Sequence, residues 1–314
     1  MNKLFIIGNG FDLAHKINSR YEDFRQYLVN RLVSIAGNKY RKYDFSDSSI
    51  ITSDYSKCIE NDLLTILYFL TVADYSDSLE WKDIENAVGK LNYDEFSWLY
   101  IDESDIDKEY RANWINEDIF SPYIKILTEI PNYFKEWVKQ VDISNALAND
   151  NIKKYFDSSD IFLCFNYTST LEKVYNIDKS NICYIHGNID SGNEIYFGHG
   201  NNLTYDDYIK FIDNPNYFSV ADGYSLINDS LRKPVNKIIE NNKVFFEKLI
   251  DVHEIYSYGF SYSEVDEPYI KEICKYISCD SKWYINSYPT EEEKSHYKEV
   301  ITKCGYKNIV KEFN

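Results

Sequence analysis

The sequence predicts an α/β fold in which a doubly wound, mainly parallel sheet carries a large helical insertion after its first strand. Three observations support this fold class. The chain opens on a short apolar run, Leu4–Ile7, that ends at a glycine. Residues 39–155 give little strand signal, whereas short apolar runs alternate with helical patterns from residue 160 onward, as in βαβ units. We therefore expect residues 1–38 and 156–314 to form the sheet domain, and residues 39–155 to form a helical insertion or cap domain.

Composition restricts the classes of protein and partner. The 314 residues include 34 basic and 51 acidic side chains, a net charge of −17, which disfavours nucleic acid and anionic membrane surfaces as partners. The six cysteines show neither a CxxC pair nor a zinc spacing, so no metal is expected. The longest apolar stretch, around Leu63–Ala73, is about half a membrane span, and the N-terminal run is too short for a signal peptide. We expect a cytoplasmic protein without a membrane partner.

The first 155 residues contain one strand and several helical patterns. Leu4–Ile7 is continuously apolar, which is typical of a buried parallel strand. A helix is expected over Tyr21–Ile35, because apolar residues recur there at helical spacing and Ser19 is suited to the N-cap. Further helices are expected over residues 61–73, 81–91 and 118–141, the last interrupted by two prolines.

The second half alternates strands and helices. Strands are expected over residues 161–165, 182–185, 194–198, 254–258, 282–286 and 309–310. Helices are expected over residues 170–175, 226–250, 268–277 and 291–304. Because ligands of open α/β sheets bind at the carboxyl ends of the strands, the loops that follow these strands are where a site is expected.

The loop after the first strand has the composition of a phosphate cradle. Glycines let the backbone approach a ligand closely, and N–H groups near a helix N-terminus favour an anion. The third glycine of the full dinucleotide fingerprint is replaced by Leu13, so a tight strand-to-helix turn with a capping Asp12 is an equal alternative. The candidate binding residues here are Gly8, Asn9, Gly10, Phe11 and Asp12.

Two polar residues follow consecutive strands in the second half. Asn166 and His186 each come directly after an apolar run and lie 20 residues apart (186 − 166 = 20), so one βαβ unit would place both at the same sheet edge. An asparagine there can orient a water or a sugar hydroxyl, and a neutral histidine can accept its proton. The structural alternatives are a helix cap for Asn166 and an ordinary hydrogen-bonded residue for His186.

Three further regions carry candidates with structural alternatives. Gly259, Ser261 and Asp266 follow another strand and could hold ribose or phosphate, although Asp266 also suits an N-cap. His199 could join the same edge. Glu85 could reach a bound ligand from the insertion, the alternative being an exposed ion pair beside a packed tryptophan.

Five ordered motifs resemble the AbiH family of bacteriophage abortive infection proteins. They are Gly8–His15, Trp81–Glu85, Phe165–Thr168, Tyr184–Gly187 and Gly259–Asp266. The resemblance spans nearly the whole chain and implies a role in defence against phage, with a phage-derived trigger as a partner. It adds His15 and Thr168 to the candidate residues.

A more distant resemblance is to sirtuin-like NAD-consuming domains, which are Rossmann-like. It implies that Gly8 and Gly10 hold a pyrophosphate, that Asn166 and His186 act on the nicotinamide ribose, and that Gly259 and Ser261 contact the adenosine side. This chain departs from that pattern at three positions. Thr168 stands where an acidic residue is frequent, and Asn9 and Asp12 stand where small residues are found. The cysteine quartet of a sirtuin-type zinc is absent from the sequence, so protein deacylation is not expected.

Three functions follow as hypotheses. The first is a glycohydrolase-like enzyme that cleaves NAD+ between nicotinamide and ribose and requires no cofactor, with NAD+ as its substrate or ligand. The second is a nucleotide-binding sensor without chemistry of its own. The third is a nuclease that uses acids near Asp12 and Glu85, which the net charge of −17 disfavours. The oligomeric state, a homo-oligomer included, stays open.

Overall fold

The computed structural model describes residues 2–37, 62–73, 85, 88, 89, 121–192, 194–211 and 218–314. The chain divides into two compact units. Unit 1 comprises Met1–Arg20, Val138–Tyr196 and Pro234–Asn314, and unit 2 comprises Tyr21–Trp137 and Phe197–Lys233. The division at residues 39–155 and the helical insertion remain predictions. Most of the helix expected over residues 81–91 lies outside the described residues.

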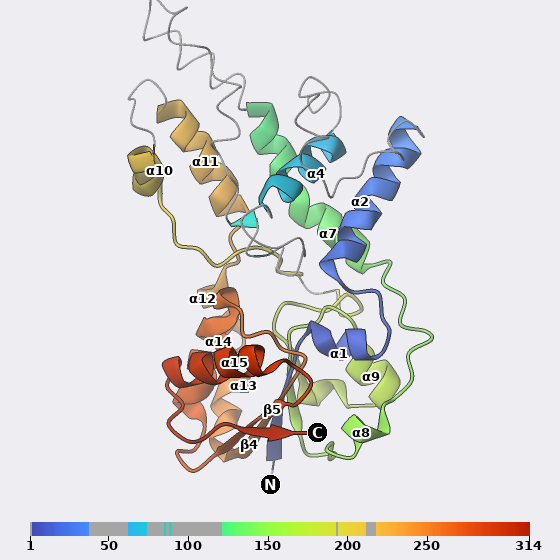
Figure 1. The fold of residues 1–314 in the computed structure, drawn as a ribbon, viewed down its shortest axis with the longest axis vertical. Coiled ribbons are helices and arrows are strands. Elements are labelled where there is room, and N and C mark those ends of the chain that lie inside the picture. Colours follow the sequence, from blue (N-terminus) through green and yellow to red (C-terminus); the bar gives the residue numbers. More distant parts are fainter. Residues whose placement is uncertain are drawn as a thin grey trace, which may run out of the picture. The chain divides into compact units, whose positions relative to one another are not determined.

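Unit 1 is built on a parallel sheet of six strands, and its α/β fold confirms the predicted fold class (Figure 1). The strand order is β3-β2-β1-β4-β5-β6. β1 pairs in parallel with β2 on one side and with β4 on the other, so the strand order reverses at β1, where such sheets bind their ligands. The strands are β1 (Asn2–Ile7), β2 (Ile161–Cys164), β3 (Ile182–Tyr184), β4 (Val252–Tyr258), β5 (Lys282–Asn286) and β6 (Lys311–Phe313).

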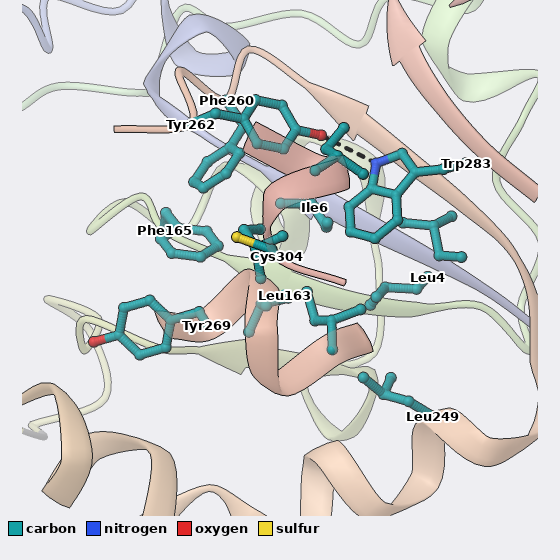
Figure 2. Packing of buried hydrophobic residues seen from close by; sticks show 14 of the residues in the cluster. Leu4, Ile6, Leu163, Phe165, Leu249, Phe260, Tyr262, Tyr269, Trp283 and Cys304 are labelled. Carbon is teal, nitrogen blue, oxygen red and sulfur yellow. Dashed lines mark hydrogen bonds between the residues drawn. The ribbon is translucent and has the colours of Figure 1, made fainter. Parts of the chain in front are cut away.

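Helices cover both faces of this sheet. Successive side chains of β1 point to opposite sides, and because they are apolar on both sides, each face needs a cover. Leu4 and Ile6 pack into one core, part of which Figure 2 shows. Phe5 and Ile7 pack into the other. The first face is covered by α12 (Val235–Asn241), α13 (Lys243–Glu247), α14 (Glu267–Tyr276) and α15 (Glu291–Lys303). The second face is covered by α1 (Asn9–Ala14), α8 (Asp150–Lys153) and α9 (Thr170–Tyr175).

A buried chain of hydrogen bonds fixes the loop after β4. The Trp283 Nε1–H donates to Tyr262 Oη at 3.0 Å (Figure 2). The Tyr262 hydroxyl donates to Ser257 Oγ at 2.7 Å, and the Ser257 hydroxyl donates to the Tyr284 carbonyl at 3.3 Å. Tyr262 has a φ of 55°, which is unfavourable for a bulky residue. This fully paired chain therefore holds the loop in a strained conformation.

The regular elements described in unit 2 are helices, apart from one β-bridge between His199 and Arg232. An aromatic cluster forms part of its interior, in which the Phe134 and Phe197 rings stack at 4.2 Å and Phe24 lies edge-on to Phe134 at 5.4 Å. No helix in the described ranges is both long and apolar enough to cross a membrane. The helices of unit 2 are α2 (Tyr21–Ala36), α4 (Asp62–Ala73), α7 (Ile130–Val138), α10 (Tyr205–Phe211) and α11 (Phe218–Ser230).

Two sequence-based expectations for elements were wrong. The helix expected over 226–250 is broken between α11 and α12, because Pro234 lacks the N–H that a continuous helix requires. Residues 194–198 form no strand. Gly198 has a φ of 145° there, and a Cβ on it would lie 2.0 Å from the Leu231 carbonyl oxygen, so this segment cannot adopt regular strand geometry. The short helix α1 agrees with the alternative of a strand-to-helix turn after the first strand.

Candidate functional site

The carboxyl ends of β1, β2, β3 and β4 lie at one edge of the sheet, since all four strands run parallel. The loops that carry most of the predicted residues leave from this edge. These segments are residues 8–12, which include the start of α1, and residues 165–168, 185–188 and 259–266. The fold therefore brings the residues that were predicted from their positions after strands to one edge of the unit 1 sheet.

The glycines of the first and fourth loops allow two backbones to touch. A Cβ on Gly259 would lie 2.3 Å from the Phe11 nitrogen, and a Cβ on Gly10 would lie 2.6 Å from the Gly259 Cα. The Gly8 N–H donates to the Tyr258 carbonyl at 3.1 Å, and the Gly10 N–H donates to the Gly259 carbonyl at 2.9 Å. These two amides are engaged within the protein, so the expectation that they are free to cradle a phosphate was wrong.

Asn9 and His15 are also engaged within unit 1. The Asn9 amide nitrogen donates to the Ser19 carbonyl at 2.9 Å, and its oxygen accepts from the Ser19 hydroxyl at 2.6 Å. His15 Nδ1 lies 2.6 Å from the Phe11 carbonyl oxygen and its Nε2 lies 2.5 Å from Tyr175 Oη. A carbonyl only accepts, so Nδ1 carries a proton and donates it to Phe11, and Nε2 shares a hydrogen bond with the Tyr175 hydroxyl. Both side chains hold this segment in place, and the His15 ring lies 4.6 Å from the ring of the buried Phe11.

Asp12 ties α1 to the loop after β2. The Thr168 hydroxyl donates to Asp12 Oδ2 at 2.6 Å, and the Thr170 hydroxyl donates to Asp12 Oδ1 at 2.8 Å. Asp12 is 1% exposed. Burial raises the pKa of its carboxyl, against the lowering effect of the two threonines, Asn166 and His15. Asp12 does not cap α1, whose N-cap position is Gly8, so the capping alternative was wrong.

Asn166 is buried with an unsatisfied amide. Its side chain lies beside the Asp12 carboxyl, where it helps to lower that group's pKa. Neither its Nδ2 nor its Oδ1 makes a hydrogen bond of regular geometry with the described part of the chain. Ser169, not Asn166, occupies the N-cap of α9, so the structural alternative for Asn166 was wrong. Buried amides normally have partners, and the interaction described for this one is its contact with the Asp12 carboxyl.

His186 lies next to Asp266 in the interior of the same edge. Its Nε2 is 3.5 Å from Asp266 Oδ1, and the ring meets Phe165 edge-on at 5.2 Å. Asp266 occupies the N-cap position of α14, but its side chain makes no capping hydrogen bond. Ser261 is exposed on the same loop. The arrangement pairs an imidazole with a carboxylate, which can orient the ring and stabilise its protonated form.

Asn286 is a candidate that sequence reasoning missed. It ends β5, is 5% exposed, and its Nδ2 has no hydrogen-bond partner in the described structure. Its Oδ1 accepts from the Tyr288 N–H at 2.9 Å. The signal was available, since Asn286 directly follows an apolar strand in the way that Asn166 does.

The last two candidates, Glu85 and His199, belong to the interior of unit 2. The Lys233 ammonium donates to both Glu85 carboxylate oxygens at 3.0 Å, and both side chains are buried. The exposed ion pair expected for Glu85 is therefore a buried one. His199 Nε2 donates to the Asn228 carbonyl at 2.9 Å, and burial lowers the pKa of His199 to about 4.

Across the described ranges, no group of three or more His, Cys, Asp or Glu side chains is placed to hold a metal ion. Comparison with known proteins gave one match. No curated protein and no solved structure matches this chain. A family model described as "Bacteriophage abortive infection AbiH" matches residues 4–287, which include every loop of the sheet edge. The chain belongs to the AbiH family of bacteriophage abortive infection proteins.

Proposed function

We propose that this protein binds NAD+ or a related nucleotide at the carboxyl edge of the unit 1 sheet and hydrolyses the bond between nicotinamide and ribose. Membership of an abortive infection family supports a defence role, in which loss of a shared metabolite would limit phage growth. The observation that carries the proposal is the buried amide of Asn166, which makes no hydrogen bond of regular geometry with the described residues and follows β2, the neighbour of the strand β1 at which the strand order reverses.

The Asn166 amide supports a ligand because the protein uses its hydrogen-bonding capacity incompletely. Leaving a buried polar group without a partner costs about 1–3 kcal/mol. A ribose hydroxyl or a water would satisfy the Asn166 amide, and both are parts of the proposed reaction. The edge also offers the exposed Ser261 hydroxyl and the unpaired Asn286 Nδ2 to a ligand.

His186 and Asp266 supply the acid–base chemistry of the proposal. Hydrolysis breaks the bond from the ribose carbon to the nicotinamide nitrogen and forms a bond from that carbon to the oxygen of water. Nicotinamide leaves with the bonding electron pair, and His186 accepts the proton that water loses. Asp266, 3.5 Å from the imidazole Nε2, stabilises the resulting cation. General-base assistance of this kind is worth about 10² to 10⁴ in rate.

A second function, a nucleotide sensor without chemistry, is favoured by the burial of His186, which is only 3% exposed. In that case the same edge binds the ligand and no bond is broken. The nuclease alternative has no comparable support. Asp12 is engaged with two threonines and Glu85 with Lys233, and the two acids belong to different units.

Purified protein incubated with NAD+ tests the proposal directly. Release of nicotinamide is followed by chromatography for the wild type and for Asn166→Ala and His186→Ala. We expect turnover in the wild type and a loss of at least 100-fold in His186→Ala. His296→Ala and Asn151→Ala, which change exposed residues on α15 and α8, are matched controls that should keep the wild-type rate.

A thermal unfolding series with NAD+ and with ADP-ribose separates the two functions. Stabilisation by both nucleotides without product, in the presence of phage lysate as well, would establish the sensor and overturn the hydrolase. The absence of both stabilisation and product would overturn the proposal as a whole. A His186→Ala variant that releases nicotinamide at the wild-type rate would remove His186 from the mechanism.

A further inference from the structure

Asp12 connects two segments that lie far apart in the sequence. Thr168 and Thr170, which follow Asn166 by two and four residues, both donate hydroxyl protons to the Asp12 carboxylate, at 2.6 Å and 2.8 Å. The two hydroxyls are themselves 3.0 Å apart. All three residues are buried. One carboxylate therefore fixes the backbone turn that carries Asn166.

The same carboxylate determines which way the Asn166 amide faces. The amide lies beside Asp12, and it has one donating and one accepting end. A carboxylate repels the amide oxygen and attracts the amide N–H groups. Nδ2 is therefore favoured on the Asp12 side, which leaves Oδ1 on the opposite side of the amide. Neither end of the amide makes a further hydrogen bond of regular geometry with the described residues, so the attraction to Asp12 is the orienting interaction described for it.

We propose that Asp12 is the positioning residue of the site, which acts through Thr168 and Thr170 to hold Asn166 with its Oδ1 presented to the ligand. This inference rests on the proposed nucleotide function and deepens it. An accepting oxygen at that point requires a donor on the ligand. The group recognised is therefore a hydroxyl, either of the ribose or of the attacking water, and not a phosphate or a carbonyl oxygen.

A role in stability alone does not account for the residue type. A buried carboxylate is costly to desolvate, and Asp12 is held against that cost by hydrogen bonds from neutral hydroxyls, without an ion pair among the hydrogen bonds described for it. An apolar side chain would fill the space between α1 and α9 without such a cost. A charged acceptor does what an apolar group cannot, which is to orient two hydroxyls and one amide at once.

A double-mutant cycle between Thr168 and Asn166 tests the proposal without requiring turnover. The dissociation constants for NAD+ and for ADP-ribose are measured by calorimetry on Thr168→Val, Asn166→Ala and the double variant. Each single variant should raise the dissociation constant about tenfold. This corresponds to about 1.4 kcal/mol, which is the contribution of one hydrogen bond. If Thr168 acts through Asn166, the double variant should also lose about tenfold and not 100-fold.

Two further variants separate positioning from stability. Thr168→Ser keeps the hydroxyl and should bind within about threefold of the wild type, even if the lost methyl lowers its melting temperature. Asp12→Asn, which keeps the shape and removes the charge, should resemble Thr168→Val. Thr290→Val is the matched control, because Thr290 also makes a side-chain hydrogen bond, in the capping box of α15. It should lower the melting temperature and leave both dissociation constants unchanged.

The outcomes distinguish the two proposals. Wild-type protein that binds neither nucleotide overturns the proposed function. Wild-type protein that binds, together with an additive 100-fold loss in the double variant or no loss in Thr168→Val, overturns the positioning role of Asp12 and leaves the proposed function in place.

Discussion

Two buried polar groups, one in each unit, are held in contrasting ways. In unit 2, Glu85 and Lys233 meet in a bidentate ion pair with both N···O distances at 3.0 Å. At the sheet edge of unit 1, both ends of the buried Asn166 amide lack a regular hydrogen bond. Both regions were candidates on sequence grounds. The difference teaches that burial of a polar residue is not by itself a sign of function, because an internal partner such as Lys233 accounts for it.

The largest expected effect comes from breaking the ion pair of unit 2. Glu85→Ala leaves the Lys233 charge buried without its carboxylate, which typically costs about 3–5 kcal/mol. Urea unfolding of the purified variant should show a loss of that size. Asp229→Ala, which removes an exposed ion pair with Arg232 in the same unit, should lose less than about 1 kcal/mol. Equal losses in the two variants would contradict a structural role for the buried pair.

The second effect is a pH dependence that originates in unit 2. The pKa of His199 is lowered from 6.5 to about 4, first by burial and further by the Arg232 charge, while Asn228 and Asp229 oppose the shift. The folded state therefore binds fewer protons than the unfolded state between these two values. Stability should fall as the pH drops below about 6.5 and level off near 4, by about 3 kcal/mol in total.

The measurement for His199 is the free energy of unfolding between pH 7 and pH 4, in wild type and in His199→Gln. The raised pKa of Asp12 changes stability with pH in the direction opposite to that of His199. This contribution is the same in wild type and variant, so it cancels and the difference between the two curves isolates His199. Parallel curves would show that His199 is not held neutral by its burial.

A third and smaller effect tests the loop contact that frames the sheet edge. Gly259→Ala places a Cβ 2.3 Å from the Phe11 nitrogen at a φ of 63°, so we expect a loss of about 2 kcal/mol in stability together with weaker nucleotide binding. Gly192→Ala is the control, since Gly192 also has a positive φ but a Cβ there meets nothing within 4 Å. If both variants behave alike, the close approach of the two loops does not shape the site.

The sequence predicted the sheet better than the helices around it. Its strands are apolar runs that end at Gly8, Asn166 or Gly259, and such runs are read directly from the letters. The break in the helix expected over residues 226–250 lies next to Pro234, a residue type that favours such a break. The absence of a strand at residues 194–198 depends on the contact of Gly198 with Leu231, and the local sequence does not predict a contact between residues this far apart.

The sequence predicted which residues gather at the candidate site, but it did not predict the contacts that each of them makes. Asn166 and His186 were found because each directly follows a strand, and the same rule would have found Asn286. The bonds from Thr168 and Thr170 to Asp12 join residues 156 and 158 positions apart, and the pair of Glu85 with Lys233 spans 148 positions. Such pairings depend on the fold, so the sequence could not separate a ligand-facing residue from one with an internal partner.

The most direct measurement of the central claim is the stability of Asn166→Ala with and without nucleotide. If the Asn166 amide is kept for a ligand, its removal should change the free energy of unfolding by less than about 1 kcal/mol, because no regular hydrogen bond within the protein is lost. At a nucleotide concentration 100 times the wild-type dissociation constant, the wild type should gain about 2.7 kcal/mol and the variant at least 1 kcal/mol less. A variant that unfolds 2 kcal/mol more easily, yet is stabilised by NAD+ as much as the wild type, would contradict the account.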